Sequence, residues 1–394
     1  MEYADFCSAL EAYPKPLAFV DLDALDENIQ LVKERVKYKI PIRIATKSIR
    51  CVWILNYIRE QLGELYAGLM AFSPEEAVWL CQKGFENIVI GYPYVHSQSL
   101  KNILAQNSAQ KKIVVMVDLI EHLDRLQHIG WSEGKQFLVC VDLDMSTRFP
   151  FLYFGVYRSS IRTEKKLKEF LAYIRKCSHL RLVGAMGYEA QISGVQDIPL
   201  GKPFWAPIIR ILKKNSIHSL TARRQKMIQI IKQTGFSLEF VNGGGTGSLE
   251  SSLQDATLTE VTVGSAFFAP ALFEGYSNFR HRPAAGFALE VTRNPEKGVY
   301  TCAGGGYVAS GAAGMDKLPQ PWLPQGASLI RNEGAGEVQT PIVTKELLRL
   351  GMPVIFRHAK AGELCERFNS LLLFRKGKVV QEVLTYRGEG KCFL

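Results

Sequence analysis

The chain has 394 residues, of which 47% are hydrophobic and 22% are charged, a composition typical of a folded soluble protein with room for two domains. No apolar run approaches the roughly 18 residues that a membrane helix needs, and the first residues lack the basic-then-apolar pattern of a signal peptide. The net charge of +10 is spread over short basic clusters without a nucleic-acid-binding motif, so we expect neither a membrane nor a nucleic acid as partner.

Eight cysteines are scattered along the sequence, and none of them forms a C-x-x-C pair. This pattern is typical of reduced thiols and not of a disulfide framework. We therefore expect a cytoplasmic protein.

Short apolar runs alternate with amphipathic helical stretches from about residue 17 to 270. After a first run, LAFVDLD, eight further runs are predicted to be strands, and they begin near residues 42, 65, 88, 112, 137, 182, 238 and 260. Such alternation predicts a parallel sheet with helical crossovers. Because eight strand–helix units over roughly 230 residues match the size of a (β/α)₈ barrel, we predict an α/β fold with a TIM-type barrel over residues 20–275.

The alternation of strand-like and helix-like segments ends after about Ser277. The segments there, such as GFALEVTR and MPVIFRH, are short, punctuated by glycine and rich in residues that favour strands. We predict a β-rich C-terminal domain over residues 276–394, joined by residues 1–19, because the first predicted strand is not needed by the barrel. This organisation brings the two ends of the chain together.

Reactive side chains follow several predicted barrel strands at their C-terminal ends, where the active site of such a barrel lies. Lys47 follows the first strand, Arg148 comes shortly after the fifth, and Tyr188 and Glu189 follow the sixth. A lysine that is desolvated at a barrel mouth has a lowered pKa and forms an imine with a carbonyl compound. Lys47 is therefore the predicted nucleophile.

A glycine-rich segment, NGGGTGS, follows the seventh predicted strand, and a Gly-Ser pair lies at the eighth. Consecutive glycines let the backbone approach an anion and point N–H groups at it, and phosphate sites in these barrels are often built from these two loops. The predicted phosphate site consists of Gly243, Gly244, Gly245, Thr246, Gly247, Ser248, Gly264 and Ser265. An imine-forming lysine opposite a phosphate site indicates either a phosphorylated sugar substrate or pyridoxal phosphate.

Five segments occur in a fixed order along the chain: VDLDALDENI, ATKSIRC, GYEAQI, NGGGTGS and EVTVGSAFF. Together they resemble the fold-type III pyridoxal-phosphate enzymes, and most closely the branch of D-threonine aldolases and D-serine dehydratases. The resemblance implies that Lys47 binds the cofactor as a Schiff base and removes the proton from the substrate α-carbon. It also implies that Arg148 hydrogen-bonds the phenolic oxygen of the cofactor, with Arg158 as the alternative, and that Tyr188 lines the pocket. Thr262 falls where alanine racemases place an arginine against the pyridine nitrogen.

The same branch holds a divalent metal near the cofactor through a C-terminal histidine and a cysteine or aspartate two residues farther on. This chain has His358 and Cys365, with six residues between them instead of one. Imidazole and thiolate suit zinc, and a zinc or manganese ion there would act as a Lewis acid on the substrate β-hydroxyl. We expect His358 and Cys365 to be metal ligands, with a structural histidine and a buried free cysteine as the alternative.

The predicted activity is that of a pyridoxal-phosphate lyase on a D-β-hydroxy amino acid, by aldol cleavage or deamination and with the help of a metal. An amino acid racemase is the alternative, and it needs a second acid–base residue, for which Tyr300 and Tyr307 are candidates. A non-catalytic pyridoxal-phosphate-binding protein is a further alternative, which the long C-terminal region disfavours. The resemblance also implies a homodimer in which the second domain of one chain covers the barrel mouth of the other.

Overall fold

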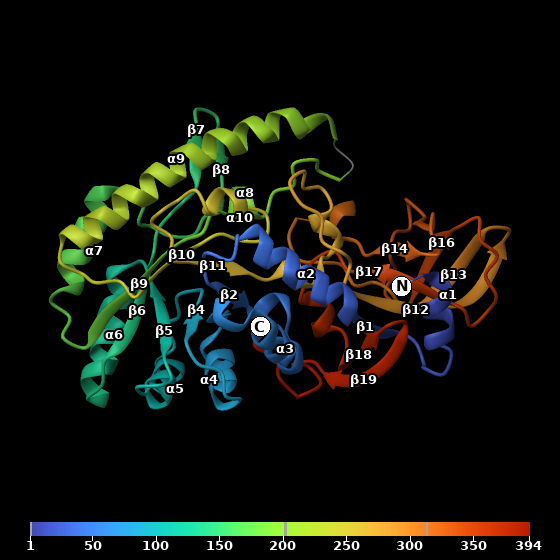
Figure 1. The fold of residues 1–394 in the computed structure, drawn as a ribbon, viewed down its shortest axis with the longest axis horizontal. Helices are drawn as coiled ribbons and strands as arrows, with labels where there is room; N and C mark the ends of the chain where they lie inside the picture. The colour runs from blue at the N-terminus through green and yellow to red at the C-terminus, as the bar shows by residue number, and fades with distance from the viewer. Residues whose placement is uncertain (1, 201–202, 313) are drawn as a thin grey trace.

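The computed structural model describes residues 2–200, 203–312 and 314–394. A closed barrel of parallel strands and a separate nine-stranded sheet organise the molecule, and they lie side by side along its longest axis (Figure 1). None of the helices in the described ranges is both long and apolar enough to cross a membrane.

Eight strands close the barrel, and they are the eight strands predicted from the sequence, so the TIM-type fold is confirmed. Most are short and rich in aliphatic residues that are buried on both faces, as expected when helices cover the outside and side chains fill the inside. In their order around the barrel they are β10 (Phe240–Gly243), β11 (Glu260–Val263), β2 (Ile42–Ala45), β3 (Tyr66–Ala71), β4 (Ile88–Ile90), β5 (Ile113–Val117), β6 (Phe137–Asp142) and β9 (Leu180–Gly187).

Helices that follow the strands pack their apolar faces against the outside of the barrel. Local capping fixes where several of them begin: the Asp21 carboxylate accepts the N–H groups of residues 23 and 24, and the Ser73 hydroxyl accepts that of Glu76. The helices are α2 (Leu22–Arg35), α3 (Val52–Leu62), α4 (Pro74–Gln82), α5 (Ser97–Gln106), α6 (Ile120–Glu133), α7 (Glu164–Ile174) and α9 (Ala206–Gln233), with the short turns α8 (Ala190–Ser193), α10 (Leu249–Ser252) and α11 (Ser265–Phe268).

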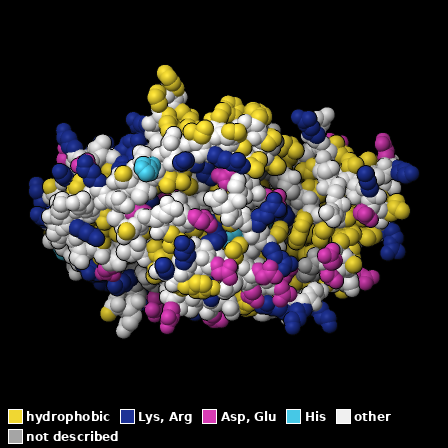
Figure 2. Space-filling view, turned by 45° about the horizontal axis from the view of Figure 1, so that its top comes forward, with side chains coloured by type: hydrophobic (Ala, Val, Ile, Leu, Met, Phe, Trp, Pro, Cys, Tyr) yellow, Lys and Arg dark blue, Asp and Glu magenta, His cyan; other side chains and the backbone are white. Residues whose placement is uncertain are grey.

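The 28-residue helix α9 runs along the top of the barrel in Figure 1, beside the hairpin of β7 (Thr147–Phe149) and β8 (Leu152–Phe154). Its first half leaves Ile208 and Ile211 exposed, and Phe204 and Trp205 are exposed just before it. Figure 2 shows hydrophobic side chains gathered over the upper part of the surface, with lysine and arginine side chains beside them. The first half of α9 therefore keeps an apolar side that the single chain does not cover.

A buried ion pair crosses the inside of the barrel. Arg43 on β2 is fully buried, and its guanidinium binds both carboxylate oxygens of Glu260 on β11, at 2.6 and 2.8 Å. A third nitrogen of Arg43 donates to the Asn87 and Leu69 carbonyls. Because both charges are paired and hydrogen-bonded, they are tolerated in the interior, and they fix the seam where the last strand meets the first.

The second sheet contains the first strand of the chain. β1 (Leu17–Asp21) pairs antiparallel with β12 (Ala285–Glu296) and parallel with β18 (Ser370–Arg375), which confirms a β-rich C-terminal domain and places β1 within its sheet. The residue bounds of the two domains stay a prediction. The remaining strands are β13 (Val299–Ala303), β14 (Gln320–Leu323), β15 (Ser328–Leu329), β16 (Gln339–Val343), β17 (Pro353–Arg357) and β19 (Lys378–Leu384), and α1 (Tyr3–Ala9) packs on the sheet through Phe6.

Candidate active site

A cavity opens at the C-terminal ends of the barrel strands, with an empty volume of about 720 Å³ that includes solvent at its mouth. Lys47 enters it after β2, Tyr92 after β4, Arg158 after β8 and Tyr188 after β9, and the glycine loop after β10 forms another part of the wall. The rule that reactive groups gather at this end of the barrel therefore holds for this chain.

Lys47 lies in a 3₁₀ turn directly after β2, and its side chain is exposed to the cavity. Its Nζ donates to the Tyr92 hydroxyl at 3.0 Å. Desolvation lowers the pKa of Lys47, but the facing phenols of Tyr92 and Tyr188 outweigh it and the pKa is raised. The expectation of a lowered pKa for Lys47 is therefore wrong, because the ammonium faces the phenol groups of Tyr92 and Tyr188 and not an apolar wall.

Tyr92 shows the opposite shift, which identifies it as the partner of Lys47. Burial raises its pKa, but the ammonium of Lys47 and the guanidinium of Arg158 bring the pKa below its ordinary value. The Lys47–Tyr92 pair can therefore pass a proton between an amine and a phenol. Tyr92 carried no motif in the sequence, although it follows a barrel strand in the same way as Lys47.

The second domain contacts the Lys47 segment directly. Gly362, in the loop after β17, lies so close to the Lys47 carbonyl that an ideal Cβ at this position would overlap it. Its φ of +78° is also one that residues with a side chain rarely adopt. A glycine is therefore required for this loop to reach the barrel mouth.

The arginine at the cavity is Arg158 and not Arg148. Arg148 is exposed on β7, where its guanidinium lies 5.8 Å from the Tyr153 ring, and it does not line the cavity. The β7–β8 hairpin carries the chain outward, so the expectation for Arg148 is corrected: the chain returns to the cavity only at Arg158, the alternative. The guanidinium of Arg158 lies 5.0 Å from the Tyr92 ring and 5.7 Å from the Tyr188 ring.

Asp142 at the end of β6 holds Arg158 in place. Its Oδ2 accepts from Arg158 Nε at 2.7 Å, while Arg158 Nη2 donates to the Gly91 carbonyl. Burial raises the pKa of Asp142 to about 6, against the lowering effect of Arg158. The pair places one guanidinium at the cavity wall, in a fixed orientation.

The predicted phosphate site divides into residues that line the cavity and residues that do not. Those that line it are Gly244, Gly245, Thr246, Gly264 and Ser265. Three others do not line it. Gly243 packs against Arg224, and Gly247 packs against Tyr276. The Ser248 hydroxyl points toward the Glu189 carboxylate. The glycines at both ends of the segment thus serve close packing, and the middle of the loop faces the cavity.

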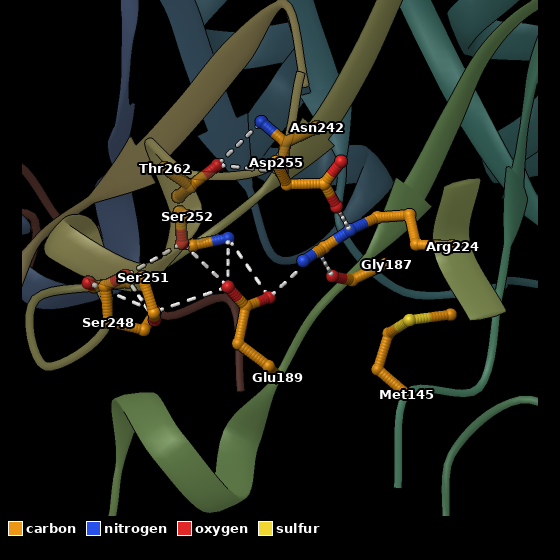
Figure 3. A network of polar contacts seen from close by, with 12 residues as sticks. Met145, Gly187, Glu189, Arg224, Asn242, Ser248, Ser251, Ser252, Asp255 and Thr262 are labelled. Atoms are coloured by element: carbon orange, nitrogen blue, oxygen red, sulfur yellow. Dashed lines mark hydrogen bonds and ion pairs between the residues drawn. The ribbon is translucent and has the colours of Figure 1, made fainter. Parts of the chain in front are cut away.

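A buried polar network fixes the glycine loop from behind (Figure 3). The Glu189 carboxylate accepts the N–H of Gly244 at 3.1 Å and the Ser252 hydroxyl at 2.7 Å. Arg224 of α9 binds Glu189 at 3.1 Å and Asp255 at 2.7 Å. Because Glu189 occupies the Gly244 amide, this N–H is not free for a ligand, and Glu189 is a positioning residue.

Thr246 and Thr262 also lie at the cavity. Thr246 Oγ1 accepts from the Ala266 N–H at 3.0 Å, so its own proton is free to be donated, and its carbonyl accepts from Arg35 at 2.7 Å. The Thr262 hydroxyl is within 2.9–3.0 Å of both amide atoms of Asn242, a cavity residue that the sequence did not single out. A neutral hydroxyl therefore stands at position 262.

The two predicted metal ligands, His358 and Cys365, lie in different surroundings. His358 is buried, and its ring nitrogens have no hydrogen-bond partner among the described residues. Burial, and to a lesser extent the Arg357 charge, lowers the pKa of His358 to about 3. The imidazole is therefore neutral, as a metal ligand must be. Cys365, however, is buried beside Cys51 and Arg50, and burial raises the pKa of its thiol well above normal, which disfavours the thiolate that binds metal. Within residues 2–200, 203–312 and 314–394, no group of three or more His, Cys, Asp and Glu side chains is placed to hold a metal. In this structure the Cys365 side chain packs in the core, and its role as a metal ligand stays a prediction.

Neither tyrosine considered for a racemase lines the cavity of its own chain. Tyr300 is buried, and its hydroxyl accepts from the Leu348 N–H at 3.1 Å. Tyr307 packs edge-on against Phe287 and Phe368. Within one chain, the tyrosines at the cavity are instead Tyr92 and Tyr188.

Comparisons with known proteins agree with this architecture. A 3-hydroxy-D-aspartate aldolase of Paracoccus denitrificans (strain Pd 1222) is 20% identical over 257 residues, and the match spans 65% of this chain but only 60% of that protein. The crystal structure of D-threonine aldolase from Filomicrobium marinum superimposes with a TM-score of 0.82 at 19% identity, covering 98% of this chain and 97% of that one. D-threo-3-hydroxyaspartate dehydratase from Delftia sp. HT23 gives 0.77 at 17% identity, covering 96% and 98%.

These two structures share the fold of the whole chain, barrel and second sheet together. A family model described as "Alanine racemase, N-terminal domain" matches residues 20–270, which is more than half of the chain and contains every barrel strand. The resemblance to fold-type III pyridoxal-phosphate proteins is thereby confirmed, and the chain belongs to the family of the alanine racemase N-terminal domain.

Proposed function

We propose that this chain binds pyridoxal phosphate in the barrel cavity and acts as a lyase on a D-amino acid with a β-hydroxyl group. The observation that carries the proposal is one cavity that holds the Lys47 amine together with the Gly244–Thr246 loop. The named relatives, 3-hydroxy-D-aspartate aldolase, D-threonine aldolase and D-threo-3-hydroxyaspartate dehydratase, all act on such amino acids, which supports the same substrate class here.

The cavity fits this cofactor at its phosphate end and at its aldehyde end. At Gly245 the loop packs so closely on Ser193 that an ideal Cβ would overlap the Ser193 hydroxyl, and both residues line the cavity. The free Thr246 proton adds a donor for phosphate oxygens. Lys47 supplies the amine that an aldehyde requires, and Arg158 supplies a cation suited to the phenolic oxygen.

Bound pyridoxal phosphate would withdraw electrons from the substrate α-carbon. Lys47 then takes the α-proton, which is the step that the cofactor makes accessible. Tyr92, 3.0 Å from Lys47 Nζ and with a lowered pKa, exchanges a proton with Lys47, and we assign to it the transfer of a proton at the β-oxygen. Aldol cleavage needs a base at that oxygen and dehydration needs an acid, so the same pair serves either reaction.

The role of Arg158 gives a prediction with an internal control. Arg158→Met combined with Asp142→Asn, which removes both charges so that no buried carboxylate is left unpaired, should weaken cofactor binding by about 1.5–3 kcal/mol, the usual worth of a charged hydrogen bond. Arg148→Met should leave cofactor affinity unchanged, because this side chain is exposed outside the cavity. Titration of each apoprotein with pyridoxal phosphate measures both. Weaker binding in Arg148→Met alone would restore Arg148 to the site.

The substrate class is tested with the purified holoenzyme and a panel of D-threo-3-hydroxyaspartate, D-threonine, D-serine and D-alanine. Aldol cleavage yields glycine and an aldehyde, whereas dehydration yields ammonia and an oxo acid. We expect one of these product pairs from the β-hydroxy substrates and none from D-alanine. Interconversion of enantiomers without cleavage would instead support a racemase, and bound cofactor without turnover would support a non-catalytic protein.

The homodimer and the cytoplasmic location stay predictions. The proposed steps use Lys47 and Tyr92, and His358 and Cys365 as metal ligands stay a prediction.

A further inference from the structure

The surroundings of His358 differ from those that the resemblance implies. In the expected pattern the second metal ligand, a cysteine or an aspartate, stands two residues after the histidine. In this chain that position is Lys360, in the sequence FRHAKAGE. An ammonium cannot donate an electron pair to a metal, so the second ligand is replaced by a group of the opposite charge.

We propose that this protein carries out its β-hydroxyl chemistry without a bound divalent cation, and that a clamp of Lys360, Ser310 and Glu363 occupies the place of the second metal ligand. The inference deepens the proposed function and rests on it.

The clamp is defined by short contacts between the loop after β17 and the loop after β13. Lys360 Nζ donates to the Ser310 carbonyl at 2.6 Å and to its hydroxyl at 3.2 Å. The Glu363 carboxylate accepts the Ser310 N–H at 3.1 Å and also its hydroxyl. The Lys360 ammonium is therefore hydrogen-bonded to two oxygens of Ser310, a residue that is itself exposed.

The clamp belongs to the segment that closes on the barrel mouth. The loop that carries Lys360 and Glu363 also carries Gly362, which packs on the Lys47 carbonyl, and its residues 358 and 359 accept backbone bonds from Ala271 and Leu272. The next residue along, Phe273, lines the cavity. Two contacts thus hold the loop of the clamp near Lys47: the packing of Gly362 on the Lys47 carbonyl, and the backbone hydrogen bonds from Ala271 and Leu272.

The residues next to His358 in the sequence offer no anionic ligand for a metal ion. Arg357 precedes the histidine, and its guanidinium binds Glu274 and the Ala269 carbonyl. Lys360 follows it. Because Arg357 is paired with Glu274 and an ammonium stands at position 360, a divalent cation at the imidazole would find one neutral ligand and no anionic second ligand, whereas zinc sites hold three or four ligands.

The test measures metal binding separately from activity. Wild type, Lys360→Asp and Lys345→Asp holoenzymes are dialysed against Mn²⁺ or Zn²⁺ alone, and bound metal is counted per chain. Lys360→Asp restores the His-x-Asp pattern, and Lys345→Asp makes the same change of charge at an exposed lysine of the same domain. We expect well below one metal ion per chain in wild type and in Lys345→Asp. Lys360→Asp should bind the metal roughly 10–100-fold more tightly than wild type, which is the change in metal affinity that altered surroundings of a ligand typically cause.

Two further measurements decide the inference. His358→Ala in the Lys360→Asp background should remove the gained metal, and wild-type turnover should be unchanged in a chelator. One tightly bound ion per wild-type chain that is lost in His358→Ala, or turnover that stops in chelator and returns with Zn²⁺, would overturn the inference while leaving the proposed lyase intact. If no β-hydroxy amino acid is turned over, the proposed function fails, and the metal counts still decide whether this chain holds a cation.

Discussion

Lys47→Ala is expected to lower turnover by at least about 10³-fold, because a single amine serves both as the attachment point for the cofactor and as the base at the α-carbon. Lys47 lines the cavity directly after β2, and its Nζ lies 3.0 Å from the Tyr92 hydroxyl. Steady-state rates on the best substrate of the panel measure the loss.

Two variants separate the chemistry of Lys47 from its charge. Lys47→Arg keeps the cation beside Tyr92 but has no nucleophilic amine, so it should be as inactive as Lys47→Ala. Added ethylamine should restore part of the activity of Lys47→Ala and none of that of Lys47→Arg, in which the larger side chain fills the space. Lys168→Ala, on the exposed side of α7, should behave as wild type. Full activity in Lys47→Arg would show that only the charge is needed.

Gly245→Ala is expected to weaken cofactor binding severely. The added Cβ would overlap the Ser193 hydroxyl and come within 2.9 Å of the Ser193 Cβ, so Ser193 or the loop must shift, and both line the cavity. Overpacking of this kind costs about 1–3 kcal/mol, which corresponds to roughly 5- to 150-fold in the dissociation constant. Titration of the apoprotein with pyridoxal phosphate measures the change.

A second substitution tests whether this clash is the cause. Ser193→Gly removes the two atoms closest to the new Cβ and leaves Tyr188 Cε2 at 3.3 Å, so Gly245→Ala with Ser193→Gly should bind the cofactor more tightly than Gly245→Ala alone. Thermal unfolding of each variant separates a local movement of the loop from loss of the fold. Normal cofactor affinity in Gly245→Ala would mean that the loop is only a turn, and equal weakness in the double variant would place the cause elsewhere.

The fold was predictable because its signals are local. Most barrel strands are short apolar runs followed by an amphipathic helix, and the count of eight strands identified the barrel before any contact was known. The first strand could be assigned outside the barrel for the same reason: it exceeded the count, and it pairs with β12 and β18. Lys47 and the middle of the glycine loop followed from their places at strand ends.

The parts of the site that the sequence did not give depend on the path of loops and on contacts between distant residues. Arg148 and Arg158 lie ten positions apart, and only the outward course of the β7–β8 hairpin decides which one reaches the cavity. Arg224 binds Glu189 from the middle of α9, and nothing in its neighbourhood in the sequence indicates that contact. Cys365 looked like a ligand because of its residue type, yet it packs beside Cys51, more than 300 positions earlier in the chain.

The pKa of Lys47 shows the same limit at a single side chain. A lysine at a barrel mouth suggests desolvation, which lowers its pKa. The actual direction depends on Tyr92 and Tyr188, which arrive from two other strands and raise it. To predict whether a pKa is raised or lowered, one must therefore know the neighbouring side chains as well as the position of the residue.

The central claim is that this cavity holds pyridoxal phosphate on Lys47, and borohydride reduction of the purified protein followed by peptide mass mapping tests it most directly. Reduction makes the link between the cofactor and the lysine permanent, so the modified peptide identifies the residue. We predict that the adduct maps to Lys47 in wild type and is absent in Lys47→Ala, while Lys168→Ala retains it. An adduct on any other lysine, or none in a protein saturated with the cofactor, would contradict the account.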